Sequence, residues 1–361
     1  MELENNQIIN ALLVGCGRIS RKHFDALNDL AESGVQITAV VDVDTLKSQN
    51  LVKNKMIPIF GNLKDIPNTL TYDLGVVMTD SGKHYEHAKF FVSRGIDVLV
   101  EKPVTLKLEQ AYELENLARE QNCKIYVVKQ NRYNAAVQKA RSSVDQGLIG
   151  RINIGTIRVR WNRPQSYYDQ ADWRGTWEFD GGVIANQASH HIDLLQWFMG
   201  PIQEVSAYDA RFGVDIETEN SVVAAVKFLS GALGTIEAST CIRPRNIEGS
   251  LSLIGELGTI EIGGNAVNNI TTFLVEDMKE INELTPTIPI NPNDVYGAGH
   301  KSVYQDIIKD RNGELNSAVE ITESLKSLEL IHMIYKSIEE GRPVLASEQD
   351  IRSSRLGVKN V

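Results

Sequence analysis

The chain has 361 residues, which is long enough for two domains with separate cores. Its 42% hydrophobic and 23% charged residues are ordinary for a globular protein, and its net charge of −10 argues against a nucleic-acid partner. The acidic start MELENNQ lacks the pattern of a secretion signal, and no apolar run approaches the roughly 18 residues of a membrane span. The three cysteines form no CxxC pair. We therefore expect a cytoplasmic protein with no membrane partner and no metal site.

The first 130 residues alternate between predicted strands and predicted helices. Residues 8–14 (IINALLV) form an apolar run, and a glycine turn and a helical pattern lead to a second run at residues 36–42. This alternation is typical of a parallel, doubly wound sheet, so we predict an N-terminal Rossmann domain over residues 1–130. Further strands are predicted at residues 72–78, 97–102 and 124–129, and further helices at residues 83–95 and 107–121.

The turn GCGRIS at residues 15–20 lies between a strand and a helix, as a dinucleotide-binding turn requires. Gly15 would allow the tight turn, and Gly17 would let the backbone approach a pyrophosphate. Ser20 replaces the third glycine of the usual pattern. Asp42 ends the second strand, where a carboxylate bonds a ribose 2′-hydroxyl and repels a 2′-phosphate. The sequence therefore predicts a dinucleotide-binding turn that prefers NAD to NADP. The alternative to dinucleotide binding is a simple glycine-rich turn.

Polar residues stand where the later strands of this predicted sheet end. They are Thr79, Ser81, Glu101 and Lys102, and ligands bind at this edge of such sheets. Pro103 favours an extended conformation at Lys102, which would aim the lysine into the crevice. The alternative is an ordinary surface lysine that opens a loop.

The pattern changes after residue 130, where short alternating strands predominate. Glycine-containing turns join them, which predicts a large, open, mainly antiparallel sheet in a C-terminal α+β domain over residues 131–361. Helical patterns interrupt this sheet after Gly181-Gly182 and close the chain at residues 297–340. The predicted strands are residues 151–162, 221–229, 232–240, 249–255 and 258–264.

The stretch GGVIANQASHHIDLLQWF holds two adjacent histidines. On a helix, Asn186, His190 and Asp193 would share one face. His191 would fall in the neighbouring row with Leu195 and Phe198, which is apolar. The pattern favours a functional His190 and a structural His191, although an isolated helical histidine more often has a structural role.

These motifs together resemble the glucose–fructose oxidoreductase/inositol dehydrogenase (Gfo/Idh/MocA) family over nearly the whole chain. The resemblance lies in the glycine turn, Asp42, Glu101-Lys102-Pro103 and the spacing GG-x3-N-x3-H-x2-D. It implies Lys102 and His190 as the catalytic pair. The family commonly has Asp where this chain has Asn186.

Three longer blocks resemble one subgroup, the UDP-N-acetylglucosaminuronate 3-dehydrogenases of bacterial lipopolysaccharide O-antigen synthesis. They are residues 128–134, 161–182 and 186–197, and Asn186 matches the subgroup. The resemblance implies NAD-dependent oxidation of the C3 hydroxyl of a UDP-N-acetylamino sugar, with a uronate favoured. His190 would act as the base, and Lys102 would stabilise the developing alkoxide. A dehydrogenase of a free sugar or inositol, and a non-catalytic NAD-binding sugar sensor, are the alternatives.

The expected contacts follow from this reading. Loop arginines suit a diphosphate or a carboxylate because their guanidinium groups bind such anions in pairs of hydrogen bonds. An open sheet with an uncovered face predicts a homodimer or homotetramer through the C-terminal domain. The expected cofactor contacts are Gly15, Gly17, Arg18, Ile19, Asp42, Thr79, Ser81, His84, Glu101, Lys102, Gln130, Trp173 and Arg174. The expected substrate contacts are Lys102, Arg163, Asn186, Gln187, His190, Arg243 and Tyr296.

Overall fold

The computed structural model describes residues 8–53, 55–276 and 299–359, which form two compact units. The first unit holds the chain up to Thr105, Glu109–Val128 and His300–Glu323, and the second holds Leu106–Leu108, Lys129–Gly299 and the chain from Ser324 onward. A single division after residue 130 therefore differs from the observed one. The reason is that helix α8 (His300–Arg311) returns to pack against α1 (Ser20–Asp29) in the first unit.

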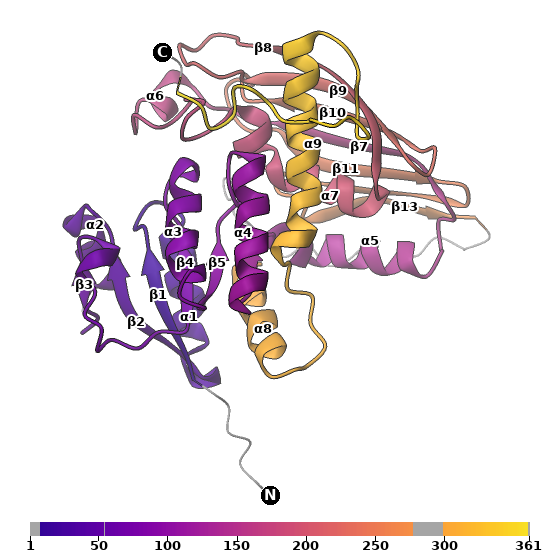
Figure 1. Cartoon of the computed structure of the whole chain (residues 1–361). Coiled ribbons are helices and arrows are strands. Elements are labelled where there is room, and N and C mark those ends of the chain that lie inside the picture. The colour runs from indigo at the N-terminus through magenta and orange to yellow at the C-terminus, as the bar shows by residue number, and fades with distance from the viewer. Residues whose placement is uncertain (1–7, 54, 277–298, 360–361) are drawn as a thin grey trace, which may run out of the picture. The chain divides into compact units, whose positions relative to one another are not determined.

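The first unit is built on a six-stranded sheet with the order β3-β2-β1-β4-β5-β6 (Figure 1). Every strand pair is parallel, and the central strands are buried along nearly their whole length, as expected for a sheet covered on both faces. The Rossmann prediction is confirmed. The strands are β1 Ile9–Val14, β2 Val35–Val41, β3 Ile59–Phe60, β4 Leu74–Val77, β5 Asp97–Val100 and β6 Ile125–Val127, and the other helices are α2 Thr45–Val52, α3 His84–Val92 and α4 Leu108–Gln121.

The register of the first sheet brings four strand ends to one level. Val14 pairs with Val41 on one side and with Val77 on the other, and Val77 pairs with Val100. The residues that follow these valines therefore emerge at one edge of the sheet. This edge carries Gly15, Asp42, Thr79 and Glu101-Lys102.

The second unit contains an eight-stranded sheet with the order β13-β12-β11-β7-β10-β9-β8-β14 (Figure 1). Among the strand pairs of this second sheet in the described residues, only β7–β10 is parallel, so the predicted mainly antiparallel sheet is confirmed. Sequence reasoning missed β8, β13 and β14. The strands are β7 Ile152–Arg160, β8 Ile202–Ala210, β9 Ser221–Phe228, β10 Leu233–Ser239, β11 Glu248–Gly255, β12 Gly258–Gly263, β13 Asn269–Val275 and β14 Val344–Leu345.

Helices cover one face of this second sheet. Helix α7 (Ser189–Met199) packs on β7 and β11. Gly155 of β7 makes this close approach possible, because a Cβ there would lie 2.5 Å from the Met199 sulfur. The other helices of the unit are α5 Ala135–Asp145, α6 Gln165–Tyr168 and most of α9 Ile321–Glu340. Among the described residues, we find no helix with the length and apolar character needed to cross a membrane.

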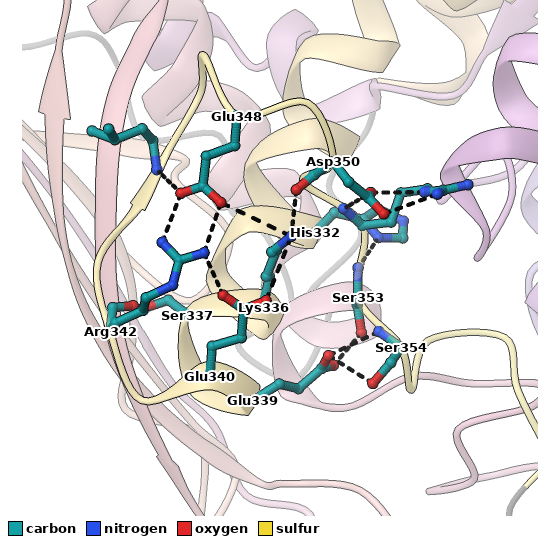
Figure 2. Close-up of polar contacts among 12 residues, drawn as sticks. His332, Lys336, Ser337, Glu339, Glu340, Arg342, Glu348, Asp350, Ser353 and Ser354 are labelled. Carbon is teal, nitrogen blue, oxygen red and sulfur yellow. Dashed lines mark hydrogen bonds and ion pairs between the residues drawn. The ribbon is translucent and has the colours of Figure 1, made fainter.

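The C-terminal segment is bound to α9 by a series of polar contacts (Figure 2). Glu339 of α9 accepts hydrogen bonds from the Ser354 N–H and from the Ser354 hydroxyl, both at 2.8 Å. The buried His332 accepts the Ser353 N–H at 3.0 Å, and its other ring nitrogen lies 3.0 Å from the Leu106 carbonyl oxygen. Since a carbonyl only accepts, this second nitrogen carries the proton. His332 therefore joins the C-terminal segment to the short stretch that follows Lys102-Pro103.

Candidate active site

The glycine turn has the shape that a dinucleotide needs. Gly15 has φ +94°, and a Cβ there would lie 2.8 Å from the backbone of Met78 and Thr79, so a side chain is excluded. Gly17 is exposed and opens onto free space, where a side chain would fill the approach to the helix N-terminus. Ser20 fits the third position because it is buried and its hydroxyl donates to the Gly17 carbonyl at 2.7 Å. Arg18 is exposed and Ile19 is half-buried.

Asp42 is held directly against the glycine turn. Its carboxylate accepts the Cys16 N–H at 2.5 Å and the Asp44 N–H at 2.8 Å. These bonds fix a half-buried carboxylate beside the backbone of the turn. An NAD site needs a carboxylate at this position, and the residues present fit that cofactor.

Glu101 lies in a buried cluster with residues of α1 and α8, two helices that are far apart in the sequence. His23 of α1 has its Nε2 2.9 Å from the Glu101 carboxylate and its Nδ1 2.6 Å from the Tyr304 hydroxyl of α8. The His300 ring lies 3.7 Å from the same carboxylate. Burial alone would raise the pKa of Glu101, but the two neighbouring histidines outweigh it and hold the pKa well below its usual range. His23, Glu101 and His300 are of types that can hold a metal ion, with ligand atoms within 4.8 Å, but the Tyr304–His23–Glu101 hydrogen bonds already use two of them.

This cluster supports the backbone at Lys102. The second Glu101 oxygen accepts the Lys102 N–H at 3.1 Å. His84 lies near the same loop, with ring nitrogens 2.7 Å from the Pro103 carbonyl oxygen and 3.1 Å from that of Thr79. His84 is buried and connects the loop at Pro103 to the loop at Thr79. Ser81 begins the short turn between Thr79 and His84.

The two adjacent histidines of the second unit have different surroundings. The Nε2 of His190 lies 2.9 Å from the Gln130 side-chain nitrogen. An amide nitrogen only donates, so in this orientation His190 is a neutral imidazole. His191 is fully buried, and its ring packs edge-on against Trp161 with 5.6 Å between centroids. Burial lowers the pKa of His191 to about 4, so this ring packs in the core as an uncharged group.

The predicted row of Asn186, His190 and Asp193 on one helix is wrong in its first member. Asn186 belongs to a π-helical turn, Val183–Gln187, and α7 begins after it at Ser189. The amide of Ala188 bonds the Val183 carbonyl five residues back, which widens the turn and changes the direction of the side chains. Asn186 instead donates its side-chain N–H to Asp180.

Asp193 anchors α7 through two buried cations. It accepts from Arg132 at 2.8 and 3.0 Å and lies 3.1 Å from the Lys129 ammonium. Burial would raise the pKa of Asp193, but these cations hold it well below its usual value. Lys129 and Arg132 flank Gln130, which contacts His190. Sequence reasoning missed both cations, because nothing in the spacing of residues 129–132 indicates burial.

A buried carboxyl group caps the turn that leads to α7. Glu219 accepts from the Ile184 N–H at 3.2 Å and from the Tyr335 hydroxyl at 3.0 Å. Gly182 leaves the room, because a Cβ there would overlap the Glu219 carboxylate. Burial raises the pKa of Glu219 to about 8, against the lowering effect of these bonds. Sequence reasoning also missed Glu219, because this residue belongs to no recognisable motif.

This raised pKa predicts a pH effect on stability. Native Glu219 stays protonated up to about pH 8, whereas the unfolded state ionises near its ordinary pKa, so stability falls as the pH rises between the two values. The variant Glu219→Gln has no carboxyl group to ionise at this position, so it should not lose this stability. The difference in unfolding free energy between the variant and wild type should therefore increase, in favour of the variant, by on the order of 2 kcal/mol from pH 5 to pH 8. Urea unfolding at both pH values measures this. Glu217→Gln, which removes an exposed carboxylate, is the control, and an equal shift there would contradict the assignment.

Arg163, a predicted substrate contact, and Arg174, a predicted cofactor contact, lie around the same amide and aromatic side chains. Arg163 donates to the Gln187 side-chain oxygen at 2.9 Å, and Gln187 donates to the Tyr167 hydroxyl at 3.1 Å. Arg174 donates to the same hydroxyl at 2.5 Å and stacks over Trp173, with 4.6 Å to the ring centroid. The structure therefore brings these five residues together.

Arg243 lies beside this group and is exposed. It donates to the Asn162 side chain at 3.0 Å and contacts the Arg163 carbonyl at 3.4 Å. Two guanidinium groups on adjacent loops can serve an anionic ligand. Tyr296, the last predicted substrate contact, lies outside the described residues.

Comparison with known families agrees with this geometry. The model of the oxidoreductase family with an NAD-binding Rossmann fold matches residues 9–129, and the model of the GFO/IDH/MocA C-terminal domain matches residues 137–261. The two matches span more than half of the chain. The chain belongs to the Gfo/Idh/MocA family. The predicted family, its NAD-binding fold and its oxidoreductase class are confirmed.

Two solved structures resemble this Gfo/Idh/MocA protein over most of its length. The WlbA dehydrogenase from Bordetella pertussis, in complex with NADH and UDP-GlcNAcA, has a TM-score of 0.89 and 34% identity, covering 96% of this chain and 100% of that one. The WlbA dehydrogenase from Chromobacterium violaceum, with the same ligands, has a TM-score of 0.87 and 36% identity, covering 96% and 98%. A Synechocystis oxidoreductase is 28% identical over 55% of this chain and 53% of its own. The chain spans about half the length of the first curated relatives it matches.

Proposed function

We propose that this protein is an NAD-dependent dehydrogenase that oxidises the C3 hydroxyl of UDP-N-acetyl-glucosaminuronate to a ketone in bacterial surface-polysaccharide synthesis. The main support is its similarity, over 96% of the chain, to two WlbA dehydrogenases in complex with NADH and UDP-GlcNAcA. The glycine turn and Asp42 fit the cofactor. The arginines of the second unit suit an anionic substrate.

The chemistry needs a base for the hydroxyl proton and a cation near the developing alkoxide. We assign the base to His190, whose contact with Gln130 corresponds to a neutral imidazole. Lys102 would supply a hydrogen bond and positive charge to the oxygen that loses its proton. NAD would supply the hydride acceptor when bound, and the chain would position the sugar and hold the proton.

The substrate assignment is tested by following NADH absorbance with a panel of sugars. We expect NADH with UDP-GlcNAcA, less with UDP-GlcNAc, and none with free inositol or hexoses. Turnover of inositol without turnover of UDP sugars would reject the substrate class. NAD binding without turnover of any sugar would favour a sensor.

The choice of NAD is tested at Asp42. Asp42→Ala removes the carboxylate expected at the ribose hydroxyls, so NAD binding should weaken about tenfold or more and the preference over NADP should shrink. Titration of both cofactors, followed by protein fluorescence, measures the two affinities. Wild-type protein that binds NADP as tightly as NAD would contradict this role of Asp42.

We also propose a homodimer or homotetramer formed through the uncovered face of the second sheet. Leu233, Ile154 and Ile254 pair across β10, β7 and β11, and each is at least 39% exposed. An exposed apolar row of this kind favours an interface. Light scattering should show an oligomer that Ile154→Lys weakens, and a wild-type monomer would reject the proposal.

We place the protein in the cytoplasm, where NAD and UDP sugars are made.

A further inference from the structure

We propose that Asp180 is a positioning residue that fixes the orientation of the Asn186 side-chain amide, so that Asn186 offers a hydrogen-bond acceptor to the substrate. This inference rests on the proposed function, in which Asn186 is a substrate contact. Asp180 lies within the block of residues 161–182, but it has no role in the site as described so far. It lies immediately before Gly181-Gly182, at the start of the turn that leads to His190.

The hydrogen bonds of Asp180 restrict the orientation of the Asn186 side-chain amide. Asp180 is 3% exposed, and one carboxylate oxygen accepts the Gly175 N–H at 2.7 Å. The other oxygen accepts the Asn186 side-chain N–H. An ionised carboxylate only accepts, so the Asn186 amide must direct its nitrogen toward Asp180. Its carbonyl oxygen then points away from Asp180.

The neighbouring amide, that of Gln187, is held in a similar way by an arginine and a tyrosine. Gln187 receives the Arg163 N–H on its oxygen and directs its nitrogen at the Tyr167 hydroxyl. The π-helical turn thus carries two adjacent amides, each oriented by the loop over residues 163–180. Glu219 and Tyr335 hold the backbone of the turn in place. Asn186 is half exposed, so its side chain is accessible from solvent.

This arrangement specifies what Asn186 can recognise. A fixed carbonyl oxygen selects a donor, such as a sugar hydroxyl or an acetamido N–H. It disfavours an anionic oxygen, which would meet a like partial charge. Asp180 therefore acts on specificity through Asn186, without touching the substrate itself.

An exchange of the two residues tests the inference. In Asp180→Asn, the new amide can keep the Gly175 bond through its oxygen, but its nitrogen then faces Asn186. The Asn186 amide must flip and present a donor instead of an acceptor. In the double exchange Asp180→Asn with Asn186→Asp, the amide at position 180 donates to the carboxylate at position 186, which again offers an acceptor.

We expect Asp180→Asn to unfold at the wild-type temperature but to lose about tenfold or more in kcat/KM for UDP-GlcNAcA, with NAD affinity unchanged. The double exchange should recover most of that loss. Wild-type kcat/KM in Asp180→Asn, or a double exchange no better than either single one, would overturn the inference. A purely structural Asp180 would lower stability in step with activity.

A second measurement separates this inference from the proposed function, because it needs no substrate. Asn186→Asp alone places two carboxylates in contact, which raises the pKa of one of them. Its stability should therefore fall as the pH rises from 5 to 8, and the double exchange should remove that fall. If wild type does not turn over UDP-GlcNAcA, the proposed function fails while this stability test still decides the contact. A flat pH profile in Asn186→Asp would overturn the inference.

Discussion

His190→Asn should keep the fold and NAD binding but lose turnover by about 10²-fold or more, because it removes the proposed general base. The structure sharpens this expectation. The His190 Nε2 lies 2.9 Å from the Gln130 side-chain nitrogen, while the neighbouring His191 is buried against Trp161. Asparagine can still pair with Gln130, so local packing should survive the change.

The matched control is His191→Phe, which keeps an aromatic ring in the apolar site. This variant should retain substantial turnover at saturating NAD and substrate. The ring lies close to Gly249, so thermal unfolding must be measured beside activity to detect overpacking. Full activity in His190→Asn, with collapse of activity in a folded His191→Phe, would show that the other histidine is the base.

Asp193→Asn should destabilise the protein by about 3–5 kcal/mol, because the buried cations Lys129 and Arg132 lose the negative charge that they share. The amide has nearly the same shape as the carboxylate, so the loss reports charge rather than volume. Urea unfolding gives the difference in free energy. We also expect lower turnover, since these cations flank Gln130, which contacts His190.

The matched control is Asp145→Asn on α5. It breaks the pair with Arg141, in which the carboxylate is 54% exposed, and should cost less than about 1 kcal/mol. Equal losses in the two variants would mean that the buried charge of Asp193 has no special weight. A small loss at Asp193 alone would lead to the same conclusion.

Local patterns were enough to predict much of the first unit. Strand ends are visible as apolar runs followed by polar residues, and parallel pairing brings those ends to one edge, so Asp42, Thr79 and Lys102 could be predicted at one edge. The same logic predicted the mainly antiparallel second sheet, although β8 and β13 were missed. Their alternation of buried and exposed residues is less regular.

Other features depend on contacts that spacing does not encode. Tyr304 meets His23 across 281 positions of the chain, and this contact needs the return of α8 to the first unit. The Asn186 side chain was misplaced because a regular helix was assumed, whereas the backbone forms a π-helical turn. The buried positions of Asp180, Glu219 and Lys129 likewise follow from tertiary packing.

The most direct test of the proposed oxidation uses UDP-GlcNAcA labelled with deuterium at C3. A single turnover with NAD, followed by denaturation and mass spectrometry of the released nicotinamide cofactor, reports where the hydride came from even when NADH stays bound. We predict deuterium in the reduced cofactor and a 3-keto sugar nucleotide in the same amount. Reduced cofactor without deuterium, formed from that substrate, would contradict oxidation at C3.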